Sequence, residues 1–432
     1  MICVVILLFT SFLATKVNVM LPLTTVSSSG ELNTSVSAYF PILKNIGVNG
    51  VMVDVWWGIA EPSEKTYNFS AYTQLADLCN QSGLKLQCVM SFHQCGGNVG
   101  DDCNIPIPNW VRNYNDIYYR DLEGHDDTEY VSLDVDNITV LGSRTPRQAY
   151  KDFMEAFNDA MGDRMGSIVD EVQVGLGPSG ELRYPSYQSD RWSYPGVGEF
   201  QCYSDRMVSM FANASAAYGR TDWTYPPTDA GNYNSTPSDT NFFTDGYKME
   251  YGDFFINWYT SLLIDHAKLI LSDAVSIFNS TGAGVAMKVS GIHWWYDDDS
   301  HAAELTTGYM NGNAFSYDDF YTRAAEMCAE LGVTLDFTCF EMSNSEQSSS
   351  AKSDPETLVY QVLMATTDAG ASMSAENALS RYDDTAYNRI IYNACSRGGK
   401  VDAFTYLRLS ETLFSSDNFN RFRSLVSSLA NC

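Results

Sequence analysis

The chain has 432 residues, of which 45% are hydrophobic and 18% are charged, so it can fill a large core and does not have the composition of a disordered protein. Its formal net charge is -27, from 26 basic and 53 acidic side chains. A surface of that sign repels phosphate backbones and anionic lipids, which argues against nucleic acid and membranes as partners. A neutral ligand is compatible with this charge.

The N-terminus carries an uncharged apolar run, Ile2–Ala14. The run is too short to span a bilayer and has the length of a signal-peptide core. No basic residue precedes it, and Phe12 is a poor residue at the third position before a cut after Ala14. A buried N-terminal strand is the alternative. We expect residues 1–15 to be a signal peptide and the mature chain to be secreted or to enter the endomembrane lumen.

Seven Asn-X-Ser/Thr triplets without proline favour the same route, because such triplets are glycosylation acceptors in exported proteins. They begin at Asn33, Asn68, Asn80, Asn137, Asn213, Asn234 and Asn279. Ten cysteines are present, Cys3 in the leader and nine after it, so at least one of the nine stays unpaired. Cys95 and Cys103 could pair across a glycine-rich segment, since only seven residues separate them, but a bond there would restrict a loop that needs to move. The chain has no Cys-X-X-Cys pair and no Cys/His cluster, so we expect no metal site.

Eight apolar runs of strand length alternate with longer helical patterns along the chain. The strand candidates are Val17–Leu23, Gly50–Trp57, Lys85–Phe92, Val169–Leu176, Ala286–Ile292, Thr334–Glu341, Ala371–Glu376 and Val401–Leu407. Helical patterns lie between them, among others at Thr34–Asn45, Phe254–Phe278 and Asp354–Ala365. This alternation predicts an α/β protein with a (β/α)8 TIM barrel. A doubly wound α/β sheet is the alternative, but no GxGxxG follows the first strand.

Two connections, at about residues 94–149 and 177–252, are much longer than the others. In a TIM barrel they would be loops at the C-terminal face, where active sites are built, and we expect them to form an active-site pocket. The glycine-rich segment Cys95–Asp101 lacks the lysine of a phosphate loop. We interpret it as a mobile lid that delivers Asp101.

Residues at or just beyond the strand ends are candidates for chemistry, because a barrel gathers them at one face. They are Asp54, His93, Glu181, His293, Glu341, Glu376 and Arg408. Glu181 lies among Gly, Pro and aromatic residues, and Glu376 ends an otherwise uncharged run. A carboxyl group in partly apolar surroundings has a raised pKa. Glycoside hydrolysis typically uses two such carboxyl groups, one on each side of a cleft.

Two tryptophan pairs and one lysine follow or lie within these strands. Trp56–Trp57 and Trp294–Trp295 suit stacking against sugar rings, but packing between barrel and helices explains them equally well. Lys288 could be buried beside a carboxylate or could face a substrate.

Longer motifs in the chain resemble those of the β-amylase family. HQCGGNVGD (93–101) and GPSGELRYPSY (177–187) look like its two signature segments. GVMVDVWWG, MKVSGIHWWY, DFTCFEM, SAENALSRYD and TYLRLS follow the family's order, and the resemblance covers roughly Val17 to Phe422. It implies a (β/α)8 barrel that releases β-maltose, with inversion, from non-reducing ends of α-1,4-glucans such as starch, glycogen and maltodextrin.

By the family pattern, Glu181 matches the general acid and Glu376 the general base. The positions that match substrate contacts are Asp54, His93, Asp101, Lys288, His293, Thr338, Asn377, Ala378 and Arg408. Asp101 matches the family's mobile loop, and Thr338 matches an inner loop beside the base. We expect no cofactor and a monomer, with residues 16–432 forming a single catalytic domain.

The chain departs from the family pattern in a few loop positions. Ala375 stands where many relatives have glycine, Ser380 replaces a common proline, and Ser343 and Asn344 differ from the usual charged pair. These changes bear on loop rigidity and rate more than on reaction type. We expect no appended starch-binding module and weak binding to raw starch. A non-catalytic glycan-binding sensor and a retaining, internally cutting amylase are the alternative functions.

Overall fold

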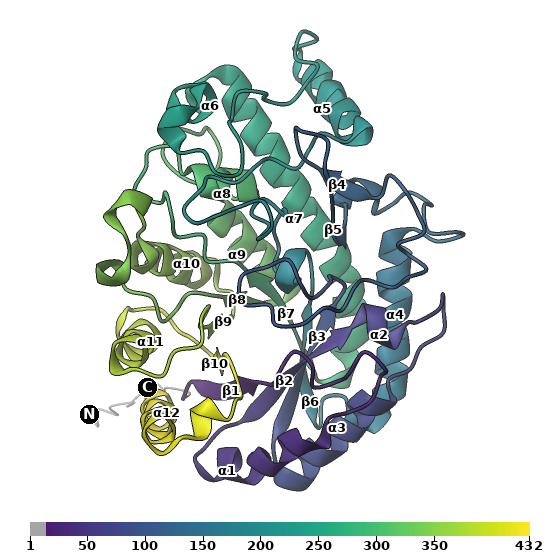
Figure 1. Ribbon diagram of the computed structural model, residues 1–432, viewed down its shortest axis with the longest axis vertical. Coiled ribbons are helices and arrows are strands. Elements are labelled where there is room, and N and C mark those ends of the chain that lie inside the picture. Colours follow the sequence, from purple (N-terminus) through teal and green to yellow (C-terminus); the bar gives the residue numbers. More distant parts are fainter. Residues whose placement is uncertain (1–13) are drawn as a thin grey trace, which may run out of the picture.

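The computed structural model describes residues 14–432, so the predicted signal peptide lies outside the described residues except for its last two positions. Eight parallel strands close into a barrel (Figure 1). In order around the ring they are β1 (Lys16–Met20), β2 (Gly50–Trp56), β3 (Lys85–Ser91), β6 (Val169–Val174), β7 (Gly284–Val289), β8 (Thr334–Phe337), β9 (Met373–Glu376) and β10 (Ala403–Tyr406). The predicted TIM barrel is confirmed, and the doubly wound alternative is wrong.

All eight predicted strands overlap a barrel strand, but several predictions run too far at the C-terminal end. The largest excess follows β8, which ends at Phe337, whereas its apolar pattern continues to Glu341. Cys339 and Phe340 are fully buried without belonging to a strand. Apolar character reports burial, and residues beneath the loops at the barrel mouth are buried as deeply as residues within a strand.

One main helix follows each barrel strand and covers the barrel from outside (Figure 1). These helices are α1 (Phe40–Asn45), α3 (Ser70–Ser82), α4 (Pro146–Met161), α7 (Glu250–Phe278), α9 (Phe320–Leu331), α10 (Pro355–Ala369), α11 (Asp384–Ser396) and α12 (Ser416–Leu429). The helix predicted at Thr34–Asn45 is split into a 3-10 turn, η1 (Thr34–Tyr39), and α1. The helix predicted at Asp354–Ala365 corresponds to α10, which Asp354 caps by accepting the N–H of Thr357.

The two long connections contain secondary structure of their own. Residues between β3 and α4 form the antiparallel pair β4 (Tyr118–Arg120) and β5 (Asp126–Val131). Residues between β6 and α7 form α5 (Asp205–Tyr218) and α6 (Asn241–Thr244). Two short helices, α2 (Trp57–Ala60) and α8 (Ala302–Thr307), follow β2 and β7. In Figure 1 these additions extend the molecule beyond the barrel on the side of α5 and α6.

The interior of the barrel below the mouth is polar and hydrogen-bonded. Gln87 of β3 donates to Glu171 of β6 at 2.9 Å, and Gln173 donates to Asp336 of β8 at 2.8 Å. Ser374 of β9 donates to the other oxygen of Asp336 at 2.9 Å. Because buried polar groups are costly when unpaired, these cross-strand bonds fix the side chains that lie under the site.

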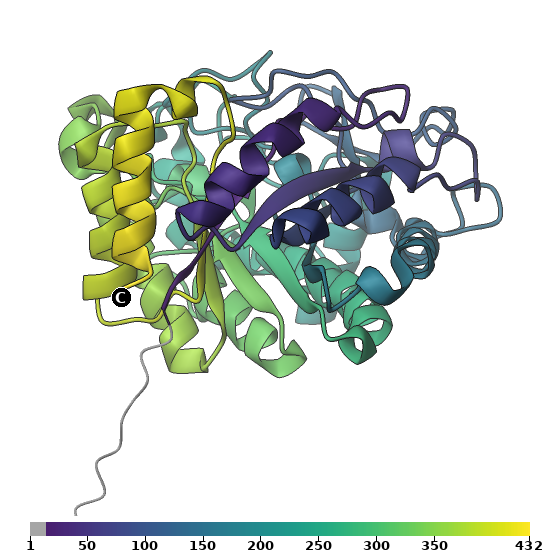
Figure 2. The ribbon, with the colours of Figure 1, turned by 90° about the horizontal axis from the view of Figure 1, so that it is seen from below.

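The first and last strands of the barrel, β1 and β10, pair with each other, and α12 contacts β1. Figure 2 shows the yellow α12 standing beside the purple N-terminal strand. Among residues 14–432, no helix combines the length and the apolar character needed to cross a bilayer.

Two disulfides are present. Cys95 and Cys103 pair, with their Cα atoms 5.7 Å apart, so the bond considered from the sequence is present. A second bond joins Cys395, in the last turn of α11, to Cys432, with Cα atoms 5.2 Å apart. The free cysteines of the described residues are all buried: Cys79, Cys88, Cys202, Cys328 and Cys339.

The Cys395–Cys432 bond ties the end of the chain to the barrel and lies away from the mouth. Replacing both cysteines by serine is expected to lower the free energy of unfolding by about 2–4 kcal/mol, because the unfolded chain regains the entropy of an open loop. Urea unfolding measures this loss. The double variant should keep the far-UV circular dichroism of the wild type in the absence of urea. An unchanged urea midpoint in the double variant would contradict a stabilising role of this bond.

Candidate active site

The two predicted carboxylates are both neighbours of Lys288 at the C-terminal end of the barrel. Glu376 is the last residue of β9 and is 2% exposed. Its Oε2 lies 3.6 Å from the Nζ of Lys288, which lies near the end of β7. Glu181 follows a short turn after β6, and its neighbour Leu182 donates its N–H to the carbonyl of Lys288 at 2.7 Å. The structure therefore brings together three residues that are widely separated in the sequence.

The turn before Glu181 depends on glycine. Gly180 has φ +73°, a conformation that residues with a side chain rarely adopt. A Cβ atom at this position would also lie 3.3 Å from the His93 ring. Glycine thus lets the chain turn tightly against β3 and aims Glu181 at the barrel mouth.

The electrostatic environment of Glu376 is unusual. Burial raises its pKa well above the ordinary glutamate value, and the neighbouring Asp336 adds to the rise, while Lys288 opposes it. Within the described part of the chain, Oε1 of Glu376 is buried and has no hydrogen-bond partner. That oxygen is therefore available to accept a proton from a ligand or from water.

Lys288 is the central cation of this group. Burial opposes its charged form, but the surrounding carboxylates, Glu376 first and then Glu181, raise its pKa above the usual lysine value. Asp54 of β2 also faces it. The Asp54 carboxylate accepts the Ser91 hydroxyl at 2.8 Å, and burial raises its pKa against the opposing charge of Arg408.

Both predicted histidines are buried and electrically neutral near neutral pH. Burial, with help from the nearby cations Lys288 and Arg183, lowers the pKa of His93 to about 3. Burial lowers the pKa of His293 to about 4, and its Nδ1 lies 2.7 Å from the hydroxyl of Ser353. Neutral imidazoles can exchange hydrogen bonds with hydroxyl groups, but these two do not supply positive charge.

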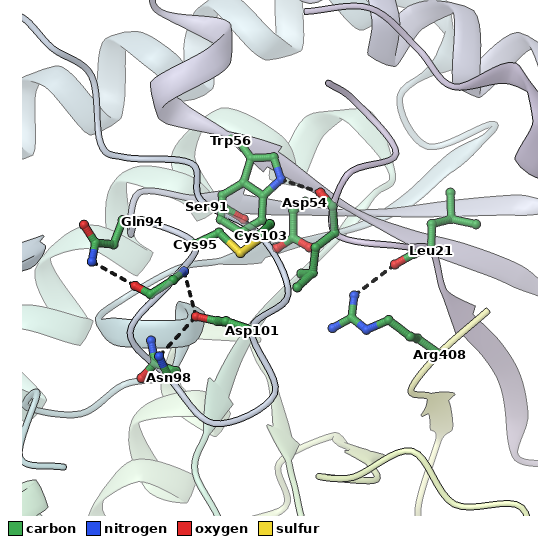
Figure 3. The surroundings of a disulfide bond; sticks show 12 residues. Leu21, Asp54, Trp56, Ser91, Gln94, Cys95, Asn98, Asp101, Cys103 and Arg408 are labelled. Carbon is green, nitrogen blue, oxygen red and sulfur yellow. Dashed lines mark hydrogen bonds between the residues drawn. A yellow bond between two sulfur atoms is a disulfide. The ribbon is translucent and has the colours of Figure 1, made fainter. Parts of the chain in front are cut away.

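Asp101 lies inside the loop closed by the Cys95–Cys103 bond (Figure 3). Its Oδ2 accepts the N–H of Gly96 at 2.8 Å and the N–H of Asn98 at 3.2 Å. Arg408, on the other side of Figure 3, donates to the carbonyl of Leu21 at 3.0 Å. In this structure the Asp101 carboxylate is therefore occupied by the backbone of its own loop.

The remaining predicted contact residues lie in the loops after β8 and β9. The hydroxyl of Thr338 accepts the N–H of Gly291 at 2.8 Å. The amide group of Asn377 donates to the carbonyls of Leu379 and Leu407, each at 2.8 Å, and accepts the N–H of Leu407 at 2.8 Å. Asn377 thus uses its side chain to join the ends of β9 and β10.

Glu341 anchors the segment after β9 that contains Asn377. Its carboxylate accepts the N–H groups of Ala378 at 3.0 Å and Leu379 at 2.8 Å. Burial raises the pKa of Glu341 to about 7, although these backbone bonds lower it. The sequence places Glu341 at a strand end but does not reveal that it anchors the segment next to Glu376.

Two further residues of the site are not found by reasoning from the sequence. Asp336 lies beside Glu376, and its only sequence signal is an acidic residue inside the apolar run of β8. Arg183 donates from Nε to Oε2 of Glu181 at 2.7 Å, and its signal is its position two residues after that glutamate. Neither signal is specific, because each side chain also has a partner from a distant segment: Asn98 for Arg183 and Gln173 for Asp336.

Both tryptophan pairs are buried, and Trp294 packs against Tyr187 and Trp192 of the long loop after Glu181. Trp56 and Trp57 are at most 2% exposed, and the Trp56 indole donates to the carbonyl of Leu23 at 3.0 Å. Trp294 and Trp295 are each 6% exposed. An exposed aromatic residue does lie near the mouth: Tyr194 is 44% exposed, and its ring centroid is 6.1 Å from that of His293.

The chain was compared with known families, sequences and structures. Residues 18–431 match the model of glycosyl hydrolase family 14. "Beta-amylase 1, chloroplastic" of Oryza sativa subsp. japonica is 46% identical over 94% of this chain and 79% of its own length. "Beta-amylase Tri a 17" of Triticum aestivum is 46% identical over 95% of this chain and 85% of its own length.

A solved structure agrees with these sequence matches. The catalytic domain of the beta-amylase from Paenibacillus polymyxa superposes with a TM-score of 0.81 at 30% identity. The match covers 97% of this chain and 99% of that domain. With its closed barrel, its paired carboxylates and a match over nearly its whole length, the chain belongs to glycosyl hydrolase family 14, the family of the beta-amylases.

Proposed function

We propose that this enzyme releases β-maltose from the non-reducing ends of starch-type α-1,4-glucans with inversion, with Glu181 as the general acid and Glu376 as the general base. The observation that supports the proposal is that Glu181 and Glu376 are the two nearest charged neighbours of the buried Lys288 at the barrel mouth. The unpartnered Oε1 of Glu376 supports its role as the acceptor of a proton. Residues 16–432 act as one catalytic domain.

Inversion at the anomeric carbon follows from one concerted displacement. Glu181 donates its proton to the glycosidic oxygen, and the bond from that oxygen to C1 breaks. A water molecule attacks C1 from the opposite face and gives its proton to Glu376. This geometry needs room for the water, so the two carboxyl groups are about 6.5–9.5 Å apart in inverting enzymes. Lys288 favours the ionised form of Glu376 that accepts the proton.

We propose that nine residues bind the glucan: Asp54, His93, Asp101, Lys288, His293, Thr338, Asn377, Ala378 and Arg408. Buried carboxylates accept sugar hydroxyl groups, and the two neutral histidines can donate or accept. Asn377 would act through its main chain, because its side chain already holds the loop, and Ala378 through its carbonyl, because its N–H is bound to Glu341. All proposed site residues come from one chain, so a monomer is sufficient for activity.

Replacement of either proposed catalytic carboxylate tests the roles. Glu181→Gln and Glu376→Gln should each lower kcat on soluble starch by about 10²–10⁴-fold or more, because general acid and base groups contribute factors of that size. Both variants should still bind maltose in calorimetry. Glu330→Gln, at an exposed position of α9, is the matched control and should keep full activity. Near-normal turnover in either variant would refute the catalytic role of the replaced glutamate. A wild-type protein that binds maltose without hydrolysing starch would be a glycan-binding sensor.

The products distinguish the proposed enzyme from a retaining, internally cutting amylase. NMR during the first minutes of digestion should show β-maltose before mutarotation. A cyclic dextrin, which has no chain end, should not be cut. An initial α-anomer would contradict inversion. Digestion of the cyclic substrate would contradict attack from chain ends.

We infer that the protein is exported and glycosylated. All seven asparagines of the Asn-X-Ser/Thr triplets are exposed, which leaves them accessible to modification. The protein purified from its source should begin near Thr15 to Val17 and should migrate faster in gels after endoglycosidase treatment. A protein without glycan would contradict export. The competing destination is the chloroplast, which the name of the rice relative gives for that relative.

A further inference from the structure

An exposed aromatic ring lies at the C-terminal face of the barrel, in the long connection between β6 and α7. Tyr194 is 44% exposed, and its ring centroid lies 6.1 Å from that of His293, which follows β7. Its hydroxyl lies 3.4 Å from Oε1 of Gln347, in the loop after β8. Loops that follow three neighbouring barrel strands therefore meet at this ring, on the face of the barrel that carries the proposed catalytic residues.

Three tryptophans fix the backbone next to Tyr194. The indole N–H groups of Trp192 and Trp294 both donate to the carbonyl of Gly196, at 2.8 and 2.9 Å. The indole N–H of Trp295 donates to the carbonyl of the proline before that glycine. A buried indole needs an acceptor for its N–H, and these three find theirs in the two residues that follow Tyr194. The segment therefore holds an exposed ring on a fixed backbone.

The ring of Tyr194 has no aromatic partner lying flat on it within residues 14–432. Its neighbours there are the rings of Trp192, Trp294 and His293, at interplanar angles of 85°, 61° and 43°. The contact of its hydroxyl with Gln347 is long for a hydrogen bond between side chains, so a hydroxyl group of a ligand can replace it. Tyr194 thus offers a ligand both an aromatic face and a weakly held hydroxyl group.

Exposure alone does not distinguish Tyr194 from other tyrosines on the surface. Tyr360, on the outer helix α10, is 45% exposed, but its ring lies beside the guanidinium group of Arg397. The position next to His293, a proposed glucan contact, is what distinguishes Tyr194. None of the nine proposed contact residues is itself exposed, so they are suited to the glucose units inside the pocket.

We propose that Tyr194 forms an outer subsite, in which its ring stacks on a glucose unit beyond the four that maltotetraose supplies. Glu376 is buried and Tyr194 is exposed, so a glucan whose end reaches Glu376 must cross the rim of the pocket on its way out. Sugar rings present C–H faces that pack on aromatic rings, and Gln347 can bind a hydroxyl group of the same unit. This proposal rests on the proposed attack from chain ends.

Replacement of Tyr194 by alanine should weaken the use of long substrates selectively. We expect kcat/KM to fall about 3–10-fold on maltoheptaose, the factor that an aromatic contact contributes, and less than about twofold on maltotetraose. The loss should appear in KM while kcat is kept, because a unit remote from the cleaved bond is bound equally in the ground state and the transition state. An equal loss on both substrates, or no loss on maltoheptaose, would overturn the proposal.

Two further variants separate stacking from other effects. Tyr194→Phe keeps the aromatic face, so its kcat/KM on maltoheptaose should stay within about twofold of the wild type. Tyr360→Ala removes a ring of matched exposure from α10 and should behave as the wild type on both substrates. A loss in Tyr194→Phe as large as in Tyr194→Ala, or a selective loss in Tyr360→Ala, would overturn stacking at Tyr194. If Tyr194→Ala does not fold, Tyr194→Leu removes the flat face while keeping an apolar side chain.

Binding separates failure of this proposal from failure of the proposed function. In the Glu376→Gln protein, in which maltoheptaose should stay uncut, the additional Tyr194→Ala change should raise the Kd for maltoheptaose about 3–10-fold in calorimetry. If the Kd rises but the wild type releases no β-maltose, the ring binds glucan and only the proposed function is wrong. If the wild type releases β-maltose and the Kd does not rise, only the outer subsite is wrong.

Discussion

The arrangement of this site depends on the burial of one ammonium group among several carboxylates. Lys288 is surrounded by Glu376, Glu181, Asp336 and Asp54, and their combined field keeps it charged despite its burial. Carboxylates buried without such a partner would take up protons, because the interior disfavours isolated charge. The cation favours the ionised form of the buried Glu376 against the burial and the Asp336 charge that raise its pKa. The closed barrel makes the arrangement possible, because it brings the ends of β2, β7, β8 and β9 to one rim.

The surroundings of this charged group are rigid where the chemistry needs fixed positions. Hydrogen bonds across the barrel interior hold Asp336 from two sides. Glu341 and Asn377 fix the segment after β9 through bonds to backbone groups. His93 and His293 are kept neutral by burial, so they add hydrogen-bonding capacity without repelling Lys288. Such preorganisation is how a site aims its groups at a reacting bond before the substrate arrives.

The lid has the opposite character. Gly96, Gly97 and Gly100 all have positive φ, and the Cys95–Cys103 bond closes the segment that contains them. The disulfide limits how far this segment can spread, while the glycines permit its backbone to change conformation. Asn98 in this segment accepts a hydrogen bond from Arg183, which also donates to Glu181, so the segment is joined to the site by a buried guanidinium group.

The amino-acid sequence by itself determined the alternation of eight strands and helices, the order of the strand-end residues and the lid, because periodicity and glycine content are local properties of the chain. The tertiary structure decided which of these residues meet. It assigned Trp56 and Trp57 to the packed interior, committed the amide of Asn377 to the backbone, and joined Cys395 to Cys432. It also placed Arg183 between Glu181 and Asn98, which are 83 positions apart along the chain. The charge and burial that act on a side chain come from segments distant in sequence, and only the closed barrel brings those segments together.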